Sequence, residues 1–558
     1  MTGVRAALGV DLGTGSVKVA LVAESGETLR SASRAYDLSS PHPGWAEADP
    51  MEWLHATTAA AGQVLDDGEG AAVVRVGFSG QMHGVVLCDE SLDPVRPAIT
   101  WADSRAGDEA ADMQSVLGSE VLARLGSPAV SGFAATSLRW IRVHEPEALE
   151  RARYALQPKD WLRARLGGLV ATEPSDASGT LLANVDEGSW NDEAIDWSGV
   201  ERDVLPPIIG SSDSAGEIHL AGRTFECVTG ASDTAAAITG LGLSIGDGFT
   251  AVGSGSQTVS LVPQPSGGIS HGTHLFATAG APRSGWYRIG AVQNAGIALR
   301  QALTWLDATA EQANAALDQG VQASDPLFVP YVAGERTPFV DPGLRGAWHG
   351  LGLDTSREAM LRSVVEGVAH AVALGIDAVL GAGAPLPDPL PLIGGGSVDA
   401  RFRQLIADAS GRRLAPRDQP DAAVVGAATG PRATSLAARG GGAAAVRCET
   451  EALRVTLSAG ASAVPVAQGG RRGSSSLSRA WCRDGRRGSR SVARRRVRVE
   501  PRRDTFDNHV APPSDRARSN QRSCACDTTA IYSKSAFNVA ARPRLCADTP
   551  CRLPAARC

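Results

Sequence analysis

One short motif occurs twice in this chain, at an offset of 240 residues, and it restricts the fold more than any other feature. Residues 10–22, VDLGTGSVKVALV, match residues 250–262, TAVGSGSQTVSLV, with six of the thirteen positions identical. In each copy an apolar stretch reaches a Gly-x-Gly-Ser turn, and apolar residues alternate along the sequence that follows. Because a period of two is typical of strands, each copy predicts a β-hairpin. Two matched hairpins, each at the head of a half-chain, predict duplicated domains.

The glycines of both turns suit them to bind phosphate. Glycine permits positive φ, and the absence of a Cβ lets backbone N–H groups approach an anion closely. A Rossmann turn would open a helix and needs a third glycine, so a dinucleotide fold is excluded. We therefore expect the two hairpins to hold phosphate groups in a shared cleft, through the turn residues Gly13, Thr14, Gly15, Ser16, Gly253, Ser254 and Gly255.

Lysine is scarce, which excludes the commoner nucleotide-binding loops. The chain has three lysines, Lys18, Lys159 and Lys534, and none of them follows a glycine. A Walker A loop requires Gly-Lys-Ser/Thr, and a protein-kinase strand requires a lysine in Val-Ala-Ile-Lys context. A nucleotide site in this chain must therefore use other groups.

The two copies of the hairpin differ at one chemically important position. Asp11 ends the first strand, whereas the corresponding residue of the second copy is Ala251. A carboxylate beside a phosphate-binding turn is typical of a site where Mg²⁺ bridges protein and phosphate. The alternative is an ordinary strand-end aspartate that caps the turn.

A second aspartate lies where a strand gives way to a helix. Residues 225–228 form a short apolar strand, and Gly230-Ala231-Ser232-Asp233-Thr234 leads from it into a helix of small residues. A helix N-terminus keeps the Asp233 carboxylate ionised, so that it can accept a proton from a substrate hydroxyl that attacks phosphorus. The alternative is a helix capped by Ser232 with an acidic residue in its first turn.

Polar and aromatic residues on two further loops suit the recognition of a polyol. Gln81, Met82 and His83 lie between glycines at a strand end, and Trp101 and Asp103 follow the next strand. The alternatives are structural: a hydrogen-bonded histidine, a core methionine, and a tryptophan packed over a turn beside an Asp103–Arg105 ion pair.

Two more loops carry glycine or charge at the end of a predicted strand. Gly394-Gly395-Gly396-Ser397 precedes a helical pattern, and its bare backbone can accept a flat ring or a phosphate; Gly395 and Gly396 are the candidates. The alternative is a tight turn. Gly334-Glu335-Arg336-Thr337-Pro338 follows the strand LFVPYV, and its Glu–Arg pair is interpreted only as a brace for that loop.

The average composition hides two unlike parts. Residues 428–558 contain 25 Arg and Lys against 9 Asp and Glu, and they hold seven of the nine cysteines. Residues 1–427 are acidic, with 29 basic and 51 acidic residues, and they contain only Cys88 and Cys227. The N-terminus lacks an apolar leader and no run of 18 apolar residues occurs, so a cytoplasmic protein with no membrane segment is expected.

Together and in order, these motifs resemble the carbohydrate kinases of the FGGY family, and most closely its xylulokinase members. The resemblance covers residues 4–427 and rests on GVDLGTGSVKVAL, QMHG, WADSR, PKDWLRARLGG, SDASGT, GASDTAAAITG, GSGSQ, GERTP and LIGGGSVDARFRQLIADASGRRL. It implies an actin-like, ribonuclease-H-type (ASKHA) fold with two α/β domains around a cleft. Residues 1–243 would form the sugar-binding domain and residues 244–427 the nucleotide-binding domain.

The resemblance implies ATP-dependent phosphorylation of D-xylulose to D-xylulose 5-phosphate, with Mg²⁺. Asp233 matches the proton acceptor of the family, and Asp11 matches an acid near the metal–nucleotide, so both would face the metal. Met82 and His83 match the substrate-binding pair of xylulokinases, and Gly395 and Gly396 match glycines on the adenine side. Phosphorylation of ribulose, gluconate or glycerol is the alternative within the family, and a homodimer is the family's usual assembly.

Two positions depart from the family pattern. The second turn has Gly253-Ser254-Gly255 where Gly-Thr-Ser is usual, which changes the hydroxyl that faces the phosphate. Thr234 follows Asp233 where many relatives have asparagine, so one sugar or metal contact is expected to differ.

The resemblance ends inside an element. A Gly-Ala-Ala helix that begins at Asp421, expected in the nucleotide domain, changes abruptly after residue 427 into an Arg-, Ser- and Cys-rich tail. The tail can be interpreted as a nucleic-acid-binding arm, as a disordered extension, or as a shifted reading frame, which we favour because the break falls within a helix. Nucleic acid is therefore not an expected partner. An inactive kinase-like protein that lacks the C-terminal helices is the alternative to an active enzyme.

Overall fold

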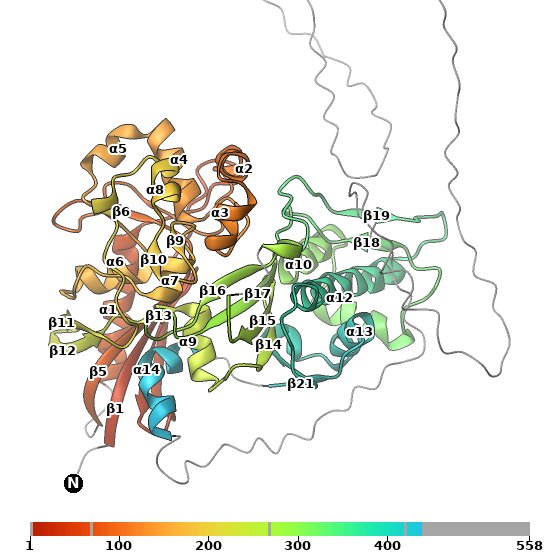
Figure 1. The fold of residues 1–558 in the computed structure, drawn as a ribbon. Helices are drawn as coiled ribbons and strands as arrows, with labels where there is room; N and C mark the ends of the chain where they lie inside the picture. The colour runs from red at the N-terminus through yellow and green to blue at the C-terminus, as the bar shows by residue number, and fades with distance from the viewer. Residues whose placement is uncertain (1–3, 67–70, 266–268, 418–420, 438–558) are drawn as a thin grey trace, which may run out of the picture. The chain divides into compact units, whose positions relative to one another are not determined.

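The computed structural model describes residues 4–66, 71–265, 269–417 and 421–437 of the 558-residue chain. All of these residues belong to one compact unit, Met1–Ala463. Two β-sheets organise this unit, one in each half of the chain (Figure 1). The tail predicted over residues 428–558 lies outside the described residues from residue 438 onward.

The first sheet grows from the N-terminal hairpin. Its strand order is β11-β12-β5-β1-β2-β3, and β13 also pairs with β5. The strands β1, β2 and β3 are antiparallel, whereas β5 runs parallel to β1. The bounds are β1 (Val4–Leu12), β2 (Ser16–Ala23), β3 (Thr28–Ala35), β5 (Ala71–Gly80), β11 (Ser214–Leu220), β12 (Arg223–Val228) and β13 (Ala231–Ser232).

The second sheet repeats this plan around the second hairpin. Its order is β16-β17-β15-β14-β20-β21, with β14, β15 and β17 antiparallel and with β20 parallel to β14. The bounds are β14 (Gly248–Val252), β15 (Ser256–Val262), β16 (His274–Ala277), β17 (Trp286–Val292), β20 (Leu390–Ile393) and β21 (Leu414–Pro416). The matched pairing confirms the duplication that the sequence repeat predicts.

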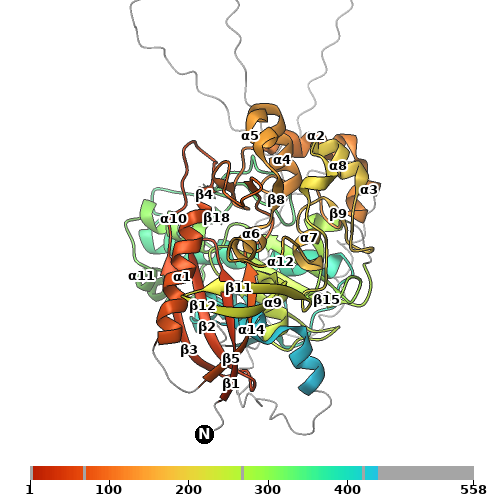
Figure 2. The same cartoon turned by 90° about the vertical axis from the view of Figure 1, so that its left-hand side faces the viewer.

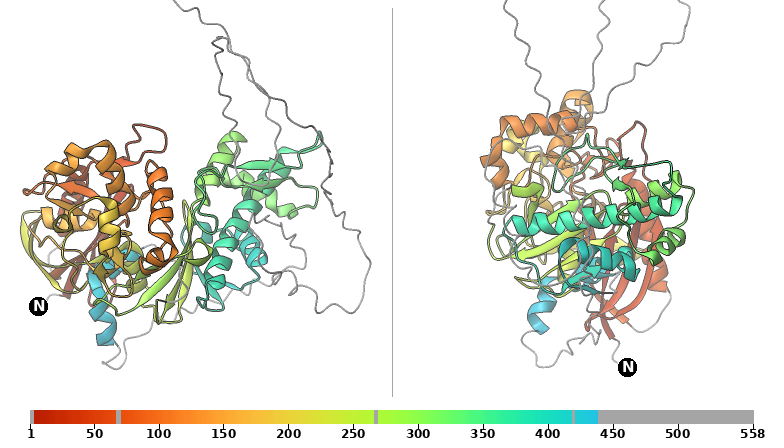
Figure 3. Two further views of the ribbon diagram at one scale, coloured as in Figure 1. Left: turned by 45° about the horizontal axis from the view of Figure 1, so that its top comes forward. Right: turned by 90° about the vertical axis from the view of Figure 1, so that its right-hand side faces the viewer.

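Helices cover both sheets. In the first half, α1 (Pro50–Asp66) packs on β2 and β3, where it buries Trp53, Val64 and their neighbours (Figure 2). In the second half, α12 (Arg357–Gly381) packs on β15 and β17, and α13 (Ala400–Ser410) packs on α12 (Figure 3). Helix α12 has the length and apolar composition of a membrane span, but 67% of its most apolar window is buried inside the protein.

Shorter elements fill the connections. The segment between β5 and β11 carries α2 (Gly107–Val116), α3 (Gly118–Arg124), α4 (Ala134–His144), α5 (Pro146–Arg151), α6 (Pro158–Arg165), α7 (Pro174–Ser178) and α8 (Asp192–Ser198). It also carries the short strands β6 (Val86–Cys88), β7 (Ala98–Ile99), β8 (Tyr154–Leu156), β9 (Ala183–Asn184) and β10 (Ser189–Trp190), and β7 pairs with β4 (Glu47–Ala48), which precedes α1. Further along lie α9 (Asp233–Gly240), α10 (Gly296–Trp305), α11 (Ala310–Ala316), β18 (Leu327–Val329) and β19 (Ala347–His349).

Helix α14 (Ala422–Ala437) packs in a place that differs from the expectation. It was predicted in the second domain, but it contacts α9 and the strands β1, β2 and β5 of the first sheet. Gly426 lies against the carbonyl of Ala236, and Gly240 lies against the carbonyl of Ala422, so α9 and α14 touch backbone to backbone. The helical geometry breaks at Gly430, where φ is 63° and ψ is 170°.

Candidate active site

Asp11 lies at the end of β1, within reach of two neighbouring strands. It faces Lys18 across the hairpin and Ser79 on the parallel strand β5. The Ser79 hydroxyl donates a hydrogen bond to the Asp11 carboxylate, while Lys18 forms an ion pair with Asp421 at the start of α14. Burial raises the pKa of Asp11, and the Ser79 hydrogen bond and the Lys18 charge oppose that rise.

Asp233 lies beside Asp11 because β13 pairs with the end of β5. In the register of these strands Ser79 faces both Asp11 and Ala231, and Asp233 follows two residues later as the first residue of α9. Thr234 donates its backbone N–H at 2.5 Å and its hydroxyl at 3.1 Å to Asp233 Oδ1. Burial, followed by the negative charge of Asp11, raises the pKa of Asp233 to about 6.

The capping alternative for this turn is not what the structure shows. Ser232 occupies the N-cap position of α9, but its side chain makes no capping hydrogen bond. The backbone N–H of Ser232 is instead bound by the Ser175 hydroxyl at 2.9 Å, which in turn hydrogen-bonds to the buried Glu173 carboxylate. The segment that carries Asp233 is thus fixed by Ser175 and Glu173 of the first half, and not by a capping hydrogen bond from Ser232.

Two carboxylates in this position fit a divalent cation. Burial disfavours the charged forms of both Asp11 and Asp233, the charge of Asp11 adds to this at Asp233, and a cation bound by the two carboxylates would offset the penalty. Among the described residues no cluster of three or more His, Cys, Asp or Glu side chains exists that could hold a metal. Mg²⁺ typically uses one or two carboxylates and fills its remaining positions with water and phosphate oxygens, so a pair suffices.

The loop after β5 places Met82 and His83 in an aromatic environment. The His83 ring stacks on Phe133 with centroids 3.9 Å apart, and its Nδ1 donates to the carbonyl oxygen of Gly179 at 2.7 Å. Burial lowers the pKa of His83 well below 6.5, so the ring is neutral at physiological pH. Met82 is 5% exposed, and its sulfur accepts a hydrogen bond from the Tyr287 hydroxyl at 3.5 Å.

Gln81, predicted with this pair, faces the hairpin instead. Its backbone N–H donates to the Leu12 carbonyl at 2.8 Å, and its side-chain amide donates to the Gly13 carbonyl at 3.3 Å. Gln81 is only 1% exposed. Its observed contacts are therefore those of a residue that fixes the first turn.

Trp101 and Asp103, which were predicted to line the same pocket, make contacts with different parts of the chain. The indole Nε1 of Trp101 donates to the Thr14 hydroxyl at 2.8 Å, so Trp101 adjoins the first turn. Asp103 is 2% exposed, and its oxygens accept from the Ala46 backbone N–H at 2.6 Å and from the Arg105 guanidinium at 2.7–3.0 Å. The Asp103–Arg105 ion pair that was the structural alternative is present, so this carboxylate is already occupied.

Several residues of the second half contact the loop after β5 that carries Met82 and His83, which is the predicted sugar loop. The sequence alone did not single these residues out. His274 and Phe276 on β16 pack against Phe133 and His83, and Tyr287 on β17 contacts Met82. Their strands follow an ordinary apolar and aromatic pattern, so nothing in the sequence distinguishes them from core residues. Only the pairing of β16 and β17 into the second sheet brings them here.

In the second half, the second turn (Gly253–Gly255) and the glycine loop after β20 (Gly394–Gly396) expose main-chain atoms at positions where the first half has polar side chains. Gly253 donates to the Gly255 carbonyl at 2.8 Å, and its own carbonyl accepts from Gly296, the first residue of α10, at 3.0 Å. A Cβ at Gly395 would meet no atom within 4 Å, whereas a Cβ at Gly396 would collide with the side chain of Val252. Gly395 is therefore open to a ligand, while packing inside the protein already requires glycine at 396.

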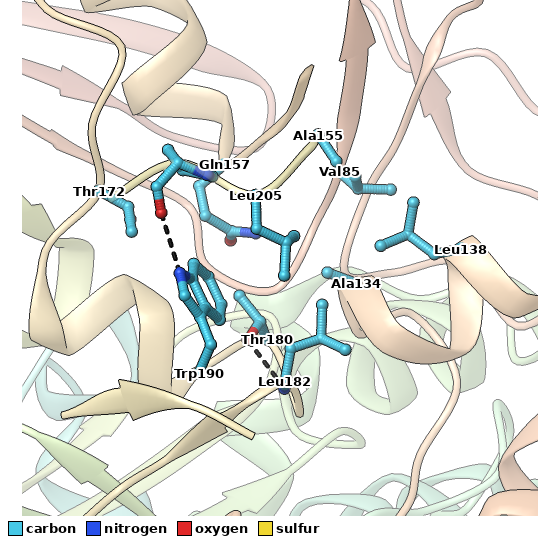
Figure 4. A pocket seen from close by; sticks show the side chains of 11 residues that line it. Val85, Ala134, Leu138, Ala155, Gln157, Thr172, Thr180, Leu182, Trp190 and Leu205 are labelled. Atoms are coloured by element: carbon cyan, nitrogen blue, oxygen red, sulfur yellow. Dashed lines mark hydrogen bonds between the residues drawn. The ribbon is translucent and has the colours of Figure 1, made fainter. Parts of the chain in front are cut away.

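A small cavity lies near the sugar loop but is not the site. Figure 4 shows it lined mostly by apolar side chains, with Gln157, Thr172 and Thr180 among them. It has room for about one water molecule, and none of the predicted site residues lines it. The cavity is therefore too small for a sugar, and it does not include Met82 or His83, the residues predicted to bind one.

Comparisons with known proteins agree with this geometry. Residues 6–240 match the N-terminal domain of the FGGY family of carbohydrate kinases, and residues 271–429 match the C-terminal domain of the same family. The chain belongs to the FGGY family of carbohydrate kinases. It is 34% identical to a xylulose kinase of Escherichia coli over 427 residues, which cover 73% of this chain and 85% of that protein.

Other FGGY kinases give the same result. A xylulose kinase of Streptomyces coelicolor is 31% identical over 448 residues, covering 77% of this chain and 90% of that protein. The crystal structure of a xyloylose kinase from Brucella ovis has a TM-score of 0.69 at 30% identity, covering 81% of this chain and 93% of that one. The fold is thus the actin-like, two-domain fold of FGGY sugar kinases. The chain is a sugar kinase, which uses ATP and a divalent metal ion.

Proposed function

We propose that this kinase phosphorylates D-xylulose at its 5-hydroxyl with ATP and Mg²⁺, giving D-xylulose 5-phosphate, in the cytoplasm. Support comes from the xylulose kinases to which the chain is similar, which are 28–34% identical over most of its length. Further support comes from Met82, whose sulfur contacts the Tyr287 hydroxyl, because Tyr287 lies close enough to Asp233 for that carboxylate to add to the rise that burial causes in the pKa of Tyr287. Residues 1–243 would supply the sugar-binding domain and residues 244–427 the nucleotide-binding domain.

Asp233 is the proposed general base. A carboxylate with a pKa of about 6 is ionised at neutral pH and yet basic enough to take the proton that a sugar hydroxyl loses as its oxygen attacks phosphorus. The hydrogen bonds from Thr234 fix one oxygen of the carboxylate and leave the other to meet the hydroxyl. Phosphoryl transfer needs little covalent chemistry from the protein, so positioning and one base suffice.

Asp11 and Asp233 are the residues that would hold Mg²⁺. The bound ion supplies neutralisation of the charge on the phosphate oxygens. The turns Gly13–Ser16 and Gly253–Gly255 would hold the phosphates through backbone N–H groups, and Gly395 would face the adenine. This arrangement explains how a chain with three lysines can use ATP without a Walker lysine.

The neutral His83 and the sulfur of Met82 would orient the sugar. A neutral imidazole can donate to one hydroxyl and accept from another, which suits a polyol better than a charged ring would. The pair of Asp11 and Asp233 at adjoining strand ends is the single observation that carries the proposal. The register of β1, β5 and β13 supports the proposal because it brings these two acids to the same end of the sheet, next to the first glycine turn.

A sugar panel tests the proposal directly. ADP release would be measured with the full chain, ATP and Mg²⁺, and with D-xylulose, D-ribulose, D-gluconate or glycerol, and phosphorus NMR would identify the product. We expect D-xylulose to give the highest kcat/KM and a 5-phosphate product. A higher kcat/KM for another sugar would show that D-xylulose is not the preferred substrate. The absence of ADP release with every sugar would favour the inactive kinase-like alternative.

A further inference from the structure

From the sequence, Glu335 and Arg336 are interpreted as residues that stabilise their own loop, Gly334–Pro338. In the structure they contact segments next to both of the predicted phosphate-binding turns. We propose that Glu335 and Arg336 form a link between the second turn and the first, and that Arg336 is a positioning residue that couples sugar binding to nucleotide binding. This inference rests on the proposed function, because it assumes that both turns hold the phosphates of one nucleotide.

Glu335 provides the end of the link that is attached to the second turn. It is 2% exposed, and its Oε1 accepts the backbone N–H of Gln293 at 2.6 Å. Its Oε2 accepts the backbone N–H and the side-chain amide of Asn294 at 3.3 and 3.1 Å. Gln293 and Asn294 join β17 to α10, and this connection lies directly against the second turn, because a Cβ at Gly255 would strike the carbonyl of Val292.

Arg336 provides the end attached to the first half. Its Nη2 donates to the Trp101 carbonyl at 2.6 Å, and its guanidinium lies 5.3 Å from the centroid of the Trp101 ring. Trp101 in turn donates its indole N–H to the Thr14 hydroxyl in the first turn. The chain of contacts from Asn294 through Glu335, Arg336 and Trp101 to Thr14 therefore spans both turns.

The charge state of Arg336 indicates a purpose beyond packing. Burial lowers the pKa of Arg336 to about 10 and the charge of Glu335 opposes that shift, but among the described residues no carboxylate forms an ion pair with its guanidinium within 4.0 Å. An arginine that is only partly exposed normally sits against an acid, since its desolvation is costly. Its positive charge also contributes to the low pKa of His83 and His274, so the guanidinium lies on the sugar side of the site.

Coupling follows from where the link is attached. Sugar that orders the loop around His83 and Trp101 would fix Arg336, and Arg336 would fix the second turn through Glu335. Both turns must hold one triphosphate in line with the sugar hydroxyl, and a displacement of about 1 Å costs about 100-fold in rate. Removing the guanidinium should therefore lower kcat more than it raises either KM.

The test compares Arg336→Met and Arg336→Lys with the control Arg345→Met. Arg345 is an exposed arginine nine residues further along the chain, whose guanidinium donates to the Pro342 and Leu344 carbonyls at 2.8 and 2.7 Å. Steady-state kinetics would give kcat and both KM values, and calorimetry would give the affinity for ADP with Mg²⁺, with and without D-xylulose. Thermal unfolding would show how much of each variant is folded.

We expect Arg336→Met to lower kcat by about 10- to 100-fold and to abolish any effect of D-xylulose on ADP affinity. Arg336→Lys should fall between Arg336→Met and wild type, and Arg345→Met should match wild type. Thr14→Val and Arg336→Met should be non-additive in a double-mutant cycle, because they cut the same chain of contacts.

Three outcomes overturn the link: Arg336→Met behaving like Arg345→Met, additive effects in the cycle, or loss of activity only in proportion to loss of folded protein. If Arg336→Met does not fold, the Arg336→Lys and Thr14→Val variants decide by the same criteria. A wild-type protein that phosphorylates no sugar would overturn the proposed function, whereas an active wild type with a silent Arg336→Met overturns only this inference.

Discussion

The two halves of this kinase share one backbone plan but present different chemistry at the same strand ends. In the first half Asp11 is the penultimate residue of β1, and the parallel strand β5 leads into Gln81, Met82 and His83. In the second half β14 has Ala251 at the matching place, and the parallel strand β20 leads into Gly394, Gly395 and Gly396. One copy offers side chains, and the other offers bare backbone.

The difference matches the two ligands. A sugar hydroxyl and a metal ion require carboxylates and directed hydrogen bonds, whereas an adenine ring and phosphates require close approach to the main chain. A duplicated pair of sheets supplies both surfaces with a single topology. The predictions below separate the two roles, from the largest expected effect to the smallest.

Removing the proposed base, Asp233, should have the largest effect. Asp233→Asn keeps the size of the side chain and its acceptor for Thr234, but it cannot take the hydroxyl proton. We expect kcat to fall by about 100- to 10,000-fold while ADP affinity stays within a few-fold of wild type. Asp196→Asn, at an exposed acid on α8, is the matched control. Turnover near the wild-type rate in Asp233→Asn would remove it from the role of base.

Loss of Asp11, the acid of the first hairpin that corresponds to Ala251 in the second, should have the next largest effect on activity. Asp11→Asn should lower kcat by about 10- to 100-fold and raise the Mg²⁺ concentration that half-saturates the enzyme. The double variant Asp11→Ala with Ala251→Asp should not recover activity, because Ala251 adjoins Ile393 where Asp11 adjoins Ser79. An unchanged Mg²⁺ requirement in Asp11→Asn would show that the acid does not serve the metal.

The sugar loop should affect the sugar alone. His83 has a φ of 75°, which asparagine tolerates better than most residues, so His83→Asn removes the ring with little backbone strain. We expect about a 10-fold rise in KM for D-xylulose with KM for ATP unchanged. His55→Asn, at an exposed residue of α1, is the control. A change in KM for ATP of the same size would mean that the ring supports the whole site.

Substitutions in the glycine loop, Gly394–Gly396, should change KM for ATP and leave KM for D-xylulose unchanged. Gly395→Ala places a methyl group in open space, so it should leave stability unchanged and raise KM for ATP by about 3- to 10-fold. Gly396→Ala meets Val252 and should lower the free energy of unfolding by about 1–3 kcal/mol. Kinetics with each substrate varied and denaturant titration distinguish the two. An unaltered KM for ATP in Gly395→Ala would exclude contact between Gly395 and the nucleotide.

The last effect concerns the stability of the folded protein and its dependence on pH, and not activity. Burial and Asp11 raise the pKa of Asp233 from 3.8 to about 6, so its charged form is disfavoured in the folded state. This penalty is absent below pH 3.8 and complete above about pH 6. Asp233→Asn should therefore raise the free energy of unfolding by about 3 kcal/mol at pH 8, which corresponds to the rise in pKa from 3.8 to about 6, with a difference that shrinks as the pH falls toward 4. A difference that is the same at both pH values would contradict the electrostatic cause.

The sequence by itself determined the architecture of the two hairpins. Alternating residues after Gly13 and Gly253 specify strands, because one face of each is buried, and the offset of 240 residues specifies the duplication. It also indicated Asp11 and Asp233, since an acid at a strand end or at the start of a helix stands out against small and apolar neighbours.

The tertiary structure alone decided which residues meet. The contact of Gln81 with the first hairpin, the contacts of Phe276 with His83 and of Tyr287 with Met82, and the packing of α14 on the first sheet all join distant segments. Periodicity reports only how a segment's own residues face, so a polar residue in a motif can equally contact a ligand or another part of the chain. The Glu335–Arg336 link is of this kind: its spacing in the sequence suggests a local ion pair, and only the fold connects it to both turns.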